Sequence, residues 1–223
     1  MVVMEKGDFV RIDYVGKLES GEIFDLTRED VAKKEKIYNE KMKYGPVSVV
    51  IGSGFVLPGL EKALEGMKPG DKKTAIIEPA DGFGQRKADM VKTVNSKVFG
   101  DGNVDPRPGM IVDFSGLKGR VQSVSSGRVT VDFNNPLAGK KLIYDVEMKE
   151  KIEKADEQIK SLLEFFGLRA SAVTISTDAA DIEADVPAEI RKKIAETILG
   201  NVKPDGKKLQ KVRFAQTFEA KKA

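Results

Sequence analysis

Residues 47–67 read VSVVIGSGFVLPGLEKALEGM and combine three local signals in one short segment. A β-branched apolar run predicts a strand, Gly52-Ser53-Gly54 predicts a turn, and the pattern after Pro58 predicts a short helix. A glycine turn between a strand and a helix is also typical of loops that bind phosphate. The segment therefore raises two alternatives, a nucleotide-binding turn or a turn with another purpose.

The glycine spacing fits neither common phosphate-binding motif. A dinucleotide-binding loop has the pattern G-x-G-x-x-G, and Gly59 comes two residues too late for it. The P-loop spacing from Gly54 to Gly59 is present, but Leu60-Glu61 replaces the lysine and the serine or threonine. The tip of the turn, residues 55–57, is apolar and cannot replace the hydration of a phosphate. An apolar loop bounded by glycines suggests an apolar pocket, but from these residues alone the better interpretation is that Val56, Leu57 and Leu60 belong to the core.

The composition removes several kinds of chemistry. The 223 residues include no cysteine and no histidine, so disulfides, thiolate nucleophiles, histidine-based triads and the commonest metal ligand are excluded. We expect no metal and no cofactor.

The net charge of +3 is too small to suggest nucleic-acid binding. No run approaches the roughly 18 apolar residues that cross a membrane, and the first residues lack the pattern of a signal peptide, so we expect a cytoplasmic protein.

Short segments with strand patterns surround the strand, turn and helix of residues 47–67. They are bounded by glycine or proline turns. The predicted strands are residues 7–18, 21–27, 47–51, 72–79 and 141–149. The charged segment 27–45 interrupts them and has sparse apolar positions at Val31, Ile37, Tyr38 and Met42. For this segment we expect a solvated helical insertion with one thin apolar stripe.

Residues 85–136 are rich in β signals separated by glycine, serine and asparagine turns. The strand-like segments are 110–116, 119–124 and 127–133, and their spacing predicts a small antiparallel unit.

From Glu150 the apolar period becomes helical. Gly167 is placed as the C-cap of the first helix. Strands at 171–177 and 180–186, a helix from Pro187 to about Leu199 and a final strand at 209–219 follow. The pattern predicts a separate small α/β unit at the C-terminal end.

Three segments in a fixed order resemble the FKBP-type peptidyl-prolyl isomerases. They are YVGKLESGEIFD (14–25), GPVSVVIGSGFVLPGLEKALEGMKPGDKKTAIIEPADGFG (45–84) and NNPLAGKKLIYDVE (134–147). An insertion after the Gly-Phe-Gly loop is similar to that of the SlyD-like branch. The charged insertion and the appended C-terminal unit resemble the long archaeal form of the family. The resemblance covers residues 1 to about 150.

The resemblance implies an α+β fold and a division into three domains. An FKBP-like bent antiparallel sheet wrapped on one short helix would comprise residues 1–84 and 137–150. The inserted small β domain would span 85–136, and a C-terminal α/β domain would span 151–223. The implied activity is cis-trans isomerisation of Xaa-Pro bonds, with macrolides as inhibitors of the pocket.

The resemblance also assigns residues to two sites. The isomerase pocket would be built from Tyr14, Phe24, Asp25, Val47, Val56, Leu57, Leu60, Phe83 and Tyr144. The inserted domain would capture unfolded polypeptides through exposed apolar residues, for which the candidates are Met90, Val94, Val98, Phe99, Met110 and Ile111. For each of these six, ordinary core packing is the alternative. The C-terminal domain would mediate a homodimer or add client-binding surface.

Several positions depart from the family pattern. Phe83 stands where many members have a tyrosine that can hold the substrate carbonyl, so orientation must rely on a backbone N–H, for which we choose that of Leu57. Leu60 replaces a tryptophan of many members, and Val47 is smaller than the common phenylalanine. The histidine- and cysteine-rich tail of some SlyD-like members is absent, so we infer no nickel handling.

A chain without histidine or cysteine suits this chemistry, because rotation about a peptide bond breaks no covalent bond. We expect catalysis by desolvation and transition-state binding in an apolar pocket. Asp25 is expected to face the rotating carbonyl while it is hydrogen-bonded to the Tyr14 hydroxyl. The alternative function is a non-catalytic holdase chaperone whose pocket has become a binding groove.

Overall fold

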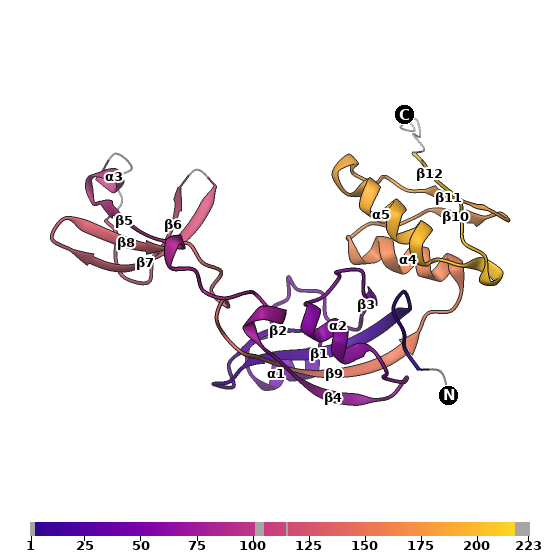
Figure 1. The fold of residues 1–223 in the computed structure, drawn as a ribbon, viewed down its shortest axis with the longest axis horizontal. Helices are drawn as coiled ribbons and strands as arrows, with labels where there is room; N and C mark the ends of the chain where they lie inside the picture. The colour runs from indigo at the N-terminus through magenta and orange to yellow at the C-terminus, as the bar shows by residue number, and fades with distance from the viewer. Residues whose placement is uncertain (1–2, 101–104, 115, 217–223) are drawn as a thin grey trace. The chain divides into compact units, whose positions relative to one another are not determined.

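The computed structural model of the chain describes residues 3–100, 105–114 and 116–216, drawn in colour in Figure 1. These residues form two compact units. One unit spans 78–141 and contains the predicted insertion 85–136. The other consists of the described residues up to Ile77 together with those from Leu142 onward. Among the described helices, none is both long and apolar enough to cross a membrane.

A five-stranded antiparallel sheet forms the first part of the larger unit, as Figure 1 shows. Strand β1 (Phe9–Leu18) is central and pairs with β2, β3 and β9. The other strands are β2 (Ile23–Leu26), β3 (Val47–Val50), β4 (Lys72–Ile77) and β9 (Leu142–Lys151), and β4 pairs with β9 at the edge. Four of the five strands lie within predicted strand segments, and β9 extends two residues beyond its predicted end at 149. The sheet and its helix agree with the α+β class expected from the sequence.

Helix α2 (Pro58–Leu64) begins with a proline, whose fixed φ suits the first helical turn. Its residues Leu60, Ala63 and Leu64 are buried. The helix lies unusually close to β4, because a Cβ added at Gly59 would be 2.5 Å from Cγ2 of Ile77. A glycine at this position therefore sets the distance between α2 and the sheet.

The charged segment 27–45 differs from the expectation. Only Glu29–Lys34 forms a helix, α1, and the prediction of a longer helical insertion is wrong. The helix ends because Lys36 adopts a positive φ of 59° and the Ile37 N–H donates back to the Ala32 carbonyl at 2.9 Å. The residues that follow include isoleucine, tyrosine and asparagine, which have lower helix propensity than the alanine and lysines of α1.

The unit of residues 78–141 contains a four-stranded antiparallel sheet in the order β5-β8-β7-β6. Its strands are β5 (Val91–Asn95), β6 (Ile111–Phe114), β7 (Leu117–Ser125) and β8 (Arg128–Asp132). Strands β6 and β8 lie within predicted strand segments and β7 extends beyond its segment at both ends, whereas β5 and helix α3 (Lys97–Gly100) were not predicted. The core gathers Phe99, Val112, Val121, Val129 and Val131. Two short 3₁₀ helices, η1 (Pro79–Asp81) and η2 (Ala88–Met90), precede the sheet.

The chain after β9 forms two helices and a second, three-stranded sheet. The helices are α4 (Ala155–Phe165) and α5 (Ala188–Asn201), and the strands are β10 (Ala172–Ile175), β11 (Ala179–Glu183) and β12 (Lys211–Ala215). A short 3₁₀ helix, η3 (Pro204–Gly206), precedes β12. Gly167 has a φ of 73° after α4, which confirms the predicted C-cap. The predicted final strand reaches 219, and its residues 217–219 lie outside the described residues.

The core of this C-terminal part includes residues of the first sheet. Phe9 of β1 and Val50 of β3 are buried in one cluster with Ile159 and Leu163 of α4. We expected residues 151–223 as a separate unit, and the structure instead places the described part of this range in the same compact unit as the first sheet. The reason is that β1 and α4 share one apolar core.

The contact at Gly59 yields a stability prediction. Replacement of Gly59 by Ala should lower the free energy of unfolding by about 1–3 kcal/mol, because the added methyl group must displace Ile77 or the helix. The matched control is Gly200→Ala in α5, where a Cβ meets nothing within 4 Å and alanine should stabilise the helix by roughly 0.5–1 kcal/mol. Urea unfolding of both variants measures this, and equal effects of the same sign would contradict the packing account.

Candidate functional site

Four of the predicted pocket residues meet in one cluster on the first sheet. The Tyr14 hydroxyl, on β1, donates a hydrogen bond of 2.9 Å to Oδ2 of Asp25, on β2. The ring of Tyr144, on β9, lies 5.5 Å from that of Tyr14 at an interplanar angle of 59°. Phe24 meets Tyr144 edge to face, with centroids 5.7 Å apart. Three aromatic rings and one carboxylate thus come together from three neighbouring strands.

The strand register explains this arrangement. Gly16 of β1 lies opposite Asp25 of β2 on one side and opposite Tyr144 of β9 on the other. A Cβ at Gly16 would be 2.9 Å from Cζ of Phe24 and 3.1 Å from Cε1 of Tyr144, so the absent side chain makes the space in which the rings close. Gly16 was missed in the sequence, although a glycine inside a strand often marks a close approach.

Thr27 fixes the end of β2 beside the cluster. Its hydroxyl donates to Oδ1 of Asp13 at 2.8 Å and accepts a hydrogen bond from the Tyr14 N–H at 2.9 Å. Its own N–H donates to the Tyr14 carbonyl at 3.0 Å. Both Thr27 and Asp13 are buried. These contacts hold the backbone of Tyr14, and they too were missed, because nothing local in the sequence pairs two residues fourteen positions apart.

Both tyrosine hydroxyls of the cluster stay protonated at neutral pH. Burial raises the pKa of Tyr14 well above its usual value, and the charge and hydrogen bond of Asp25 and the nearby Tyr144 raise it further. Burial also raises the pKa of Tyr144, with a further contribution from the charge of Asp25. Tyr14 therefore acts as a hydrogen-bond donor, and Asp25 as its acceptor.

Helix α2 lies on the face of the sheet that carries this cluster. Tyr144 lies opposite Ala75 of β4, and Ile77, two residues further on, packs against the helix at Gly59. Leu60 is buried in that helix, and Val56 and Leu57, directly before it, are half-buried.

Val47 and Phe83 complete the predicted pocket. Val47 begins β3 and lies opposite Ile12, so the alternation of β1 places it on the Tyr14 face. Phe83 is half-buried and belongs to the unit 78–141, so its assignment to the pocket stays a prediction.

The glycine turn before α2 uses its donors internally. Gly52 and Gly54 have φ values of 78° and 72°, which favour glycine. The N–H groups of Gly54 and Phe55 both donate to Oε1 of Glu61, at 2.8 and 3.3 Å. A carboxylate of the chain itself thus occupies the position that a phosphate would need. This geometry supports the rejection of nucleotide binding.

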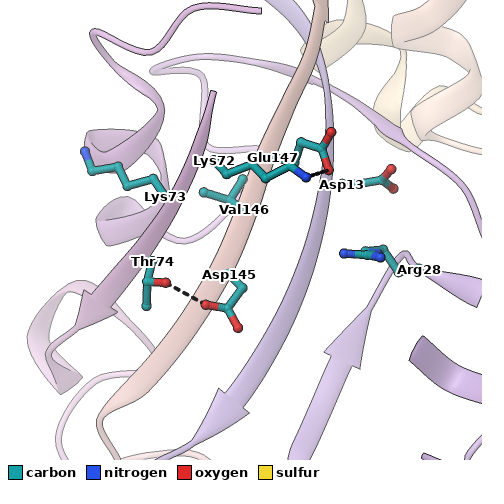
Figure 2. A pocket seen from close by; sticks show the side chains of 8 residues that line it. All are labelled: Asp13, Arg28, Lys72, Lys73, Thr74, Asp145, Val146 and Glu147. Carbon is teal, nitrogen blue, oxygen red and sulfur yellow. Dashed lines mark hydrogen bonds and ion pairs between the residues drawn. The ribbon is translucent and has the colours of Figure 1, made fainter. Parts of the chain in front are cut away.

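The opposite face of the sheet carries a polar cleft of about 210 Å³, shown in Figure 2. The Thr74 hydroxyl donates to Asp145 at 2.7 Å, and Lys72 pairs with Glu147 at 3.7 Å. Lys73 extends away from the cleft in Figure 2 and donates to the Ala63 carbonyl of α2 at 3.0 Å. Many of the charges in this cleft are thus paired within the chain, and its lining contains none of the predicted pocket residues.

The six predicted client-binding residues divide by exposure. Val98, Met110 and Ile111 are 53%, 37% and 56% exposed. Phe99 is only 6% exposed and belongs to the core of its unit, so the expectation that it presents an exposed apolar surface is wrong. Val94 packs against the same core, and Met90 is half-buried. Two exposed apolar residues of this sheet, Leu117 and Val124, were not predicted.

Comparison with known proteins identifies the family of the chain. Residues 2–149 match the family described as FKBP-type peptidyl-prolyl cis-trans isomerase. A short-type peptidyl-prolyl cis-trans isomerase of Methanocaldococcus jannaschii is 34% identical over 148 residues, which cover 66% of this chain and 94% of that protein. A SlyD protein of Treponema pallidum, described as an FKBP-type peptidyl-prolyl cis-trans isomerase, is 32% identical over 158 residues, 69% of this chain and 81% of that protein.

A third relative is the FKBP-type 16 kDa peptidyl-prolyl cis-trans isomerase of Escherichia coli. It is 33% identical over 110 residues, which cover 47% of this chain and 73% of that protein. The family match ends at residue 149, so it covers the first sheet and the unit 78–141 and leaves α4, α5 and the second sheet outside. The chain belongs to the FKBP-type peptidyl-prolyl cis-trans isomerase family, and it is SlyD-like.

Proposed function

We propose that this isomerase acts on Xaa-Pro bonds of unfolded polypeptides, in the pocket built around Tyr14 and Asp25. The observation that carries the proposal is the aromatic cluster on the α2 face, with one hydrogen-bonded carboxylate in it. The rings offer an apolar surface for a proline ring. The carboxylate and its tyrosine supply the polar group that orients a peptide unit.

The reaction itself requires no general acid or base. Rotation about a peptide bond has a barrier of about 18–20 kcal/mol, because planarity is held by amide resonance. In the twisted transition state that resonance is lost and the C–N dipole falls, so a dry pocket favours the twisted form over the more polar planar one. A reduction of the barrier by about 5–7 kcal/mol would accelerate isomerisation by roughly four to five powers of ten.

Each residue has a separate part in this mechanism. Asp25, held by the Tyr14 hydroxyl, faces the carbonyl that rotates, and Phe24 and Tyr144 exclude water around the proline. The N–H of Leu57 donates to a substrate carbonyl on the side that does not rotate. With one end of the peptide held, the binding energy can stabilise the twisted transition state more than the planar ground state.

We further propose that the unit 78–141 holds unfolded clients near the pocket. Its exposed residues Val98, Met110 and Ile111 offer apolar contacts to an unfolded chain. Attachment at a second site raises the effective concentration of proline bonds at the first. The competing candidate is a holdase without catalysis, which the family departures at Val47, Leu60 and Phe83 favour.

Replacement of Asp25 by alanine should lower kcat/KM for a proline tetrapeptide about tenfold or more while the melting temperature changes little. The loss follows because Tyr14 then lacks its acceptor and the rotating carbonyl lacks its charged neighbour. Asp30→Ala is the matched control, since Asp30 is exposed and pairs with Arg28 outside the cluster. Equal turnover by the two variants would remove Asp25 from the mechanism.

The raised pKa values of Tyr14 and Tyr144 predict how the stability of the fold changes at alkaline pH. A raised pKa in the folded state contributes stability that is fully present below the unfolded value, about 10, and is lost as the pH rises further. An absorbance titration of the four tyrosines should therefore show two that ionise only as the protein unfolds. Ionisation of all four below pH 11 in the folded protein would show that Tyr14 and Tyr144 are not buried as described.

The client-holding proposal is tested by Val98→Ser combined with Ile111→Ser. Turnover of a proline tetrapeptide should stay unchanged, whereas the catalysed refolding of a proline-limited protein should slow several-fold, because only long clients reach the second site. Lys118→Ser, an exposed change on the same sheet, is the control. Unchanged refolding would argue against client binding at these residues, and a wild-type protein inactive on the tetrapeptide would favour the holdase.

A further inference from the structure

The turn before α2 presents apolar residues to two different parts of the molecule. Val56 and Leu57 lead into α2, whereas Phe55, the residue before them, packs against the end of α4. The ring of Phe55 lies 4.7 Å from that of Phe165 at 72° and 6.0 Å from that of Phe166 at 66°. Phe165 and Phe166 also meet edge to face at 5.3 Å. Phe55 is therefore held in a three-ring cluster by the chain beyond the family match.

Helix α5 contacts the same turn. Nζ of Lys193 lies 5.7 Å from the ring centroid of Phe55 and 6.0 Å from that of Phe166, within reach of a cation–π interaction. Nδ2 of Asn201 donates to Oγ of Ser53 at 3.5 Å. Helix α5 thus contacts Ser53 and Phe55, which lie on either side of Gly54, and α4 contacts Phe55.

Helix α2, which packs on the first sheet, also holds the turn. The Glu61 carboxylate of α2 accepts from the N–H groups of Gly54 and Phe55. Residues 53–55 thus have contacts with α2, α4 and α5. Leu57, two residues further along, is the N-cap of α2, and its carbonyl accepts from the N–H groups of Leu60 and Glu61, so the turn joins the ring cluster directly to the start of the helix.

We infer that Phe55, Phe165 and Phe166 are positioning residues of the isomerase: the C-terminal part holds the turn so that the Leu57 N–H and the Val56 side chain are in place before substrate binds. This inference rests on the proposed function, since it assigns a purpose to the turn only if the pocket isomerises Xaa-Pro bonds. In this proposal the three rings act through the turn and not through contact with substrate. Their effect is preorganisation of a hydrogen-bond donor and of one apolar wall.

The test uses the full chain with Phe165→Ala. Phe165 is the last residue of α4 and is 40% exposed, so its truncation should change the melting temperature little. We expect kcat/KM for a proline tetrapeptide to fall about twofold to tenfold, the rate equivalent of one ring contact. Phe165→Tyr, which keeps the ring, should restore the wild-type value. The control is Tyr38→Ala, which removes another exposed ring, 43% exposed and stacked on Tyr44.

A double-mutant cycle separates positioning from general destabilisation. If the two rings act as one unit, Phe55→Ala should lower kcat/KM by a similar factor, and Phe55→Ala with Phe165→Ala should lower it no further. Multiplicative effects, or the same loss in Tyr38→Ala, would overturn the inference. Full activity of Phe165→Ala at wild-type melting temperature would also overturn it. A wild-type protein without tetrapeptide activity would instead overturn the proposed function on which the inference rests.

Discussion

Strand β1 is the element on which the larger unit depends. It is hydrogen-bonded to three other strands, and its two faces are covered by different parts of the chain. On one face Tyr14 and Gly16 form the floor of the aromatic cluster next to α2. On the other, Val15 packs with Leu26 of β2 and Ala32 of the charged insertion, and Phe9 shares a core with α4. One strand therefore links the pocket, the charged insertion and the C-terminal part.

The local pattern of the sequence was sufficient for most of the secondary structure. The alternation of apolar residues located the strands of the first sheet, and Gly167 located the end of α4, because both signals act within a few residues. The family resemblance added Tyr14, Phe24, Asp25 and Tyr144, which the structure brings together. Their meeting depends on strand register, which a single sequence without the resemblance would not supply.

What the sequence did not reveal depends on tertiary contacts. Gly16 and Gly59 are needed because of residues that approach them from other elements, and Phe55 is directed toward rings more than a hundred positions away. The charges of the segment 27–45 indicated a helix, but the helix ends at Lys34, and a positive φ at Lys36 turns the chain. Phe99 looked like an exposed contact and is buried, because a small β unit needs its few large side chains for its own core.

The central claim is that the pocket around Tyr14 catalyses rotation about Xaa-Pro bonds without acid-base chemistry. The most direct measurement is NMR exchange spectroscopy of a proline tetrapeptide with catalytic amounts of the full chain and of Tyr14→Phe. We predict rapid cis-trans exchange with the wild-type protein, independent of pH near neutrality, and slower exchange with the variant, which cannot donate to Asp25. Exchange at the uncatalysed rate with the wild-type protein, or an unaltered rate with Tyr14→Phe, would contradict this account of the site.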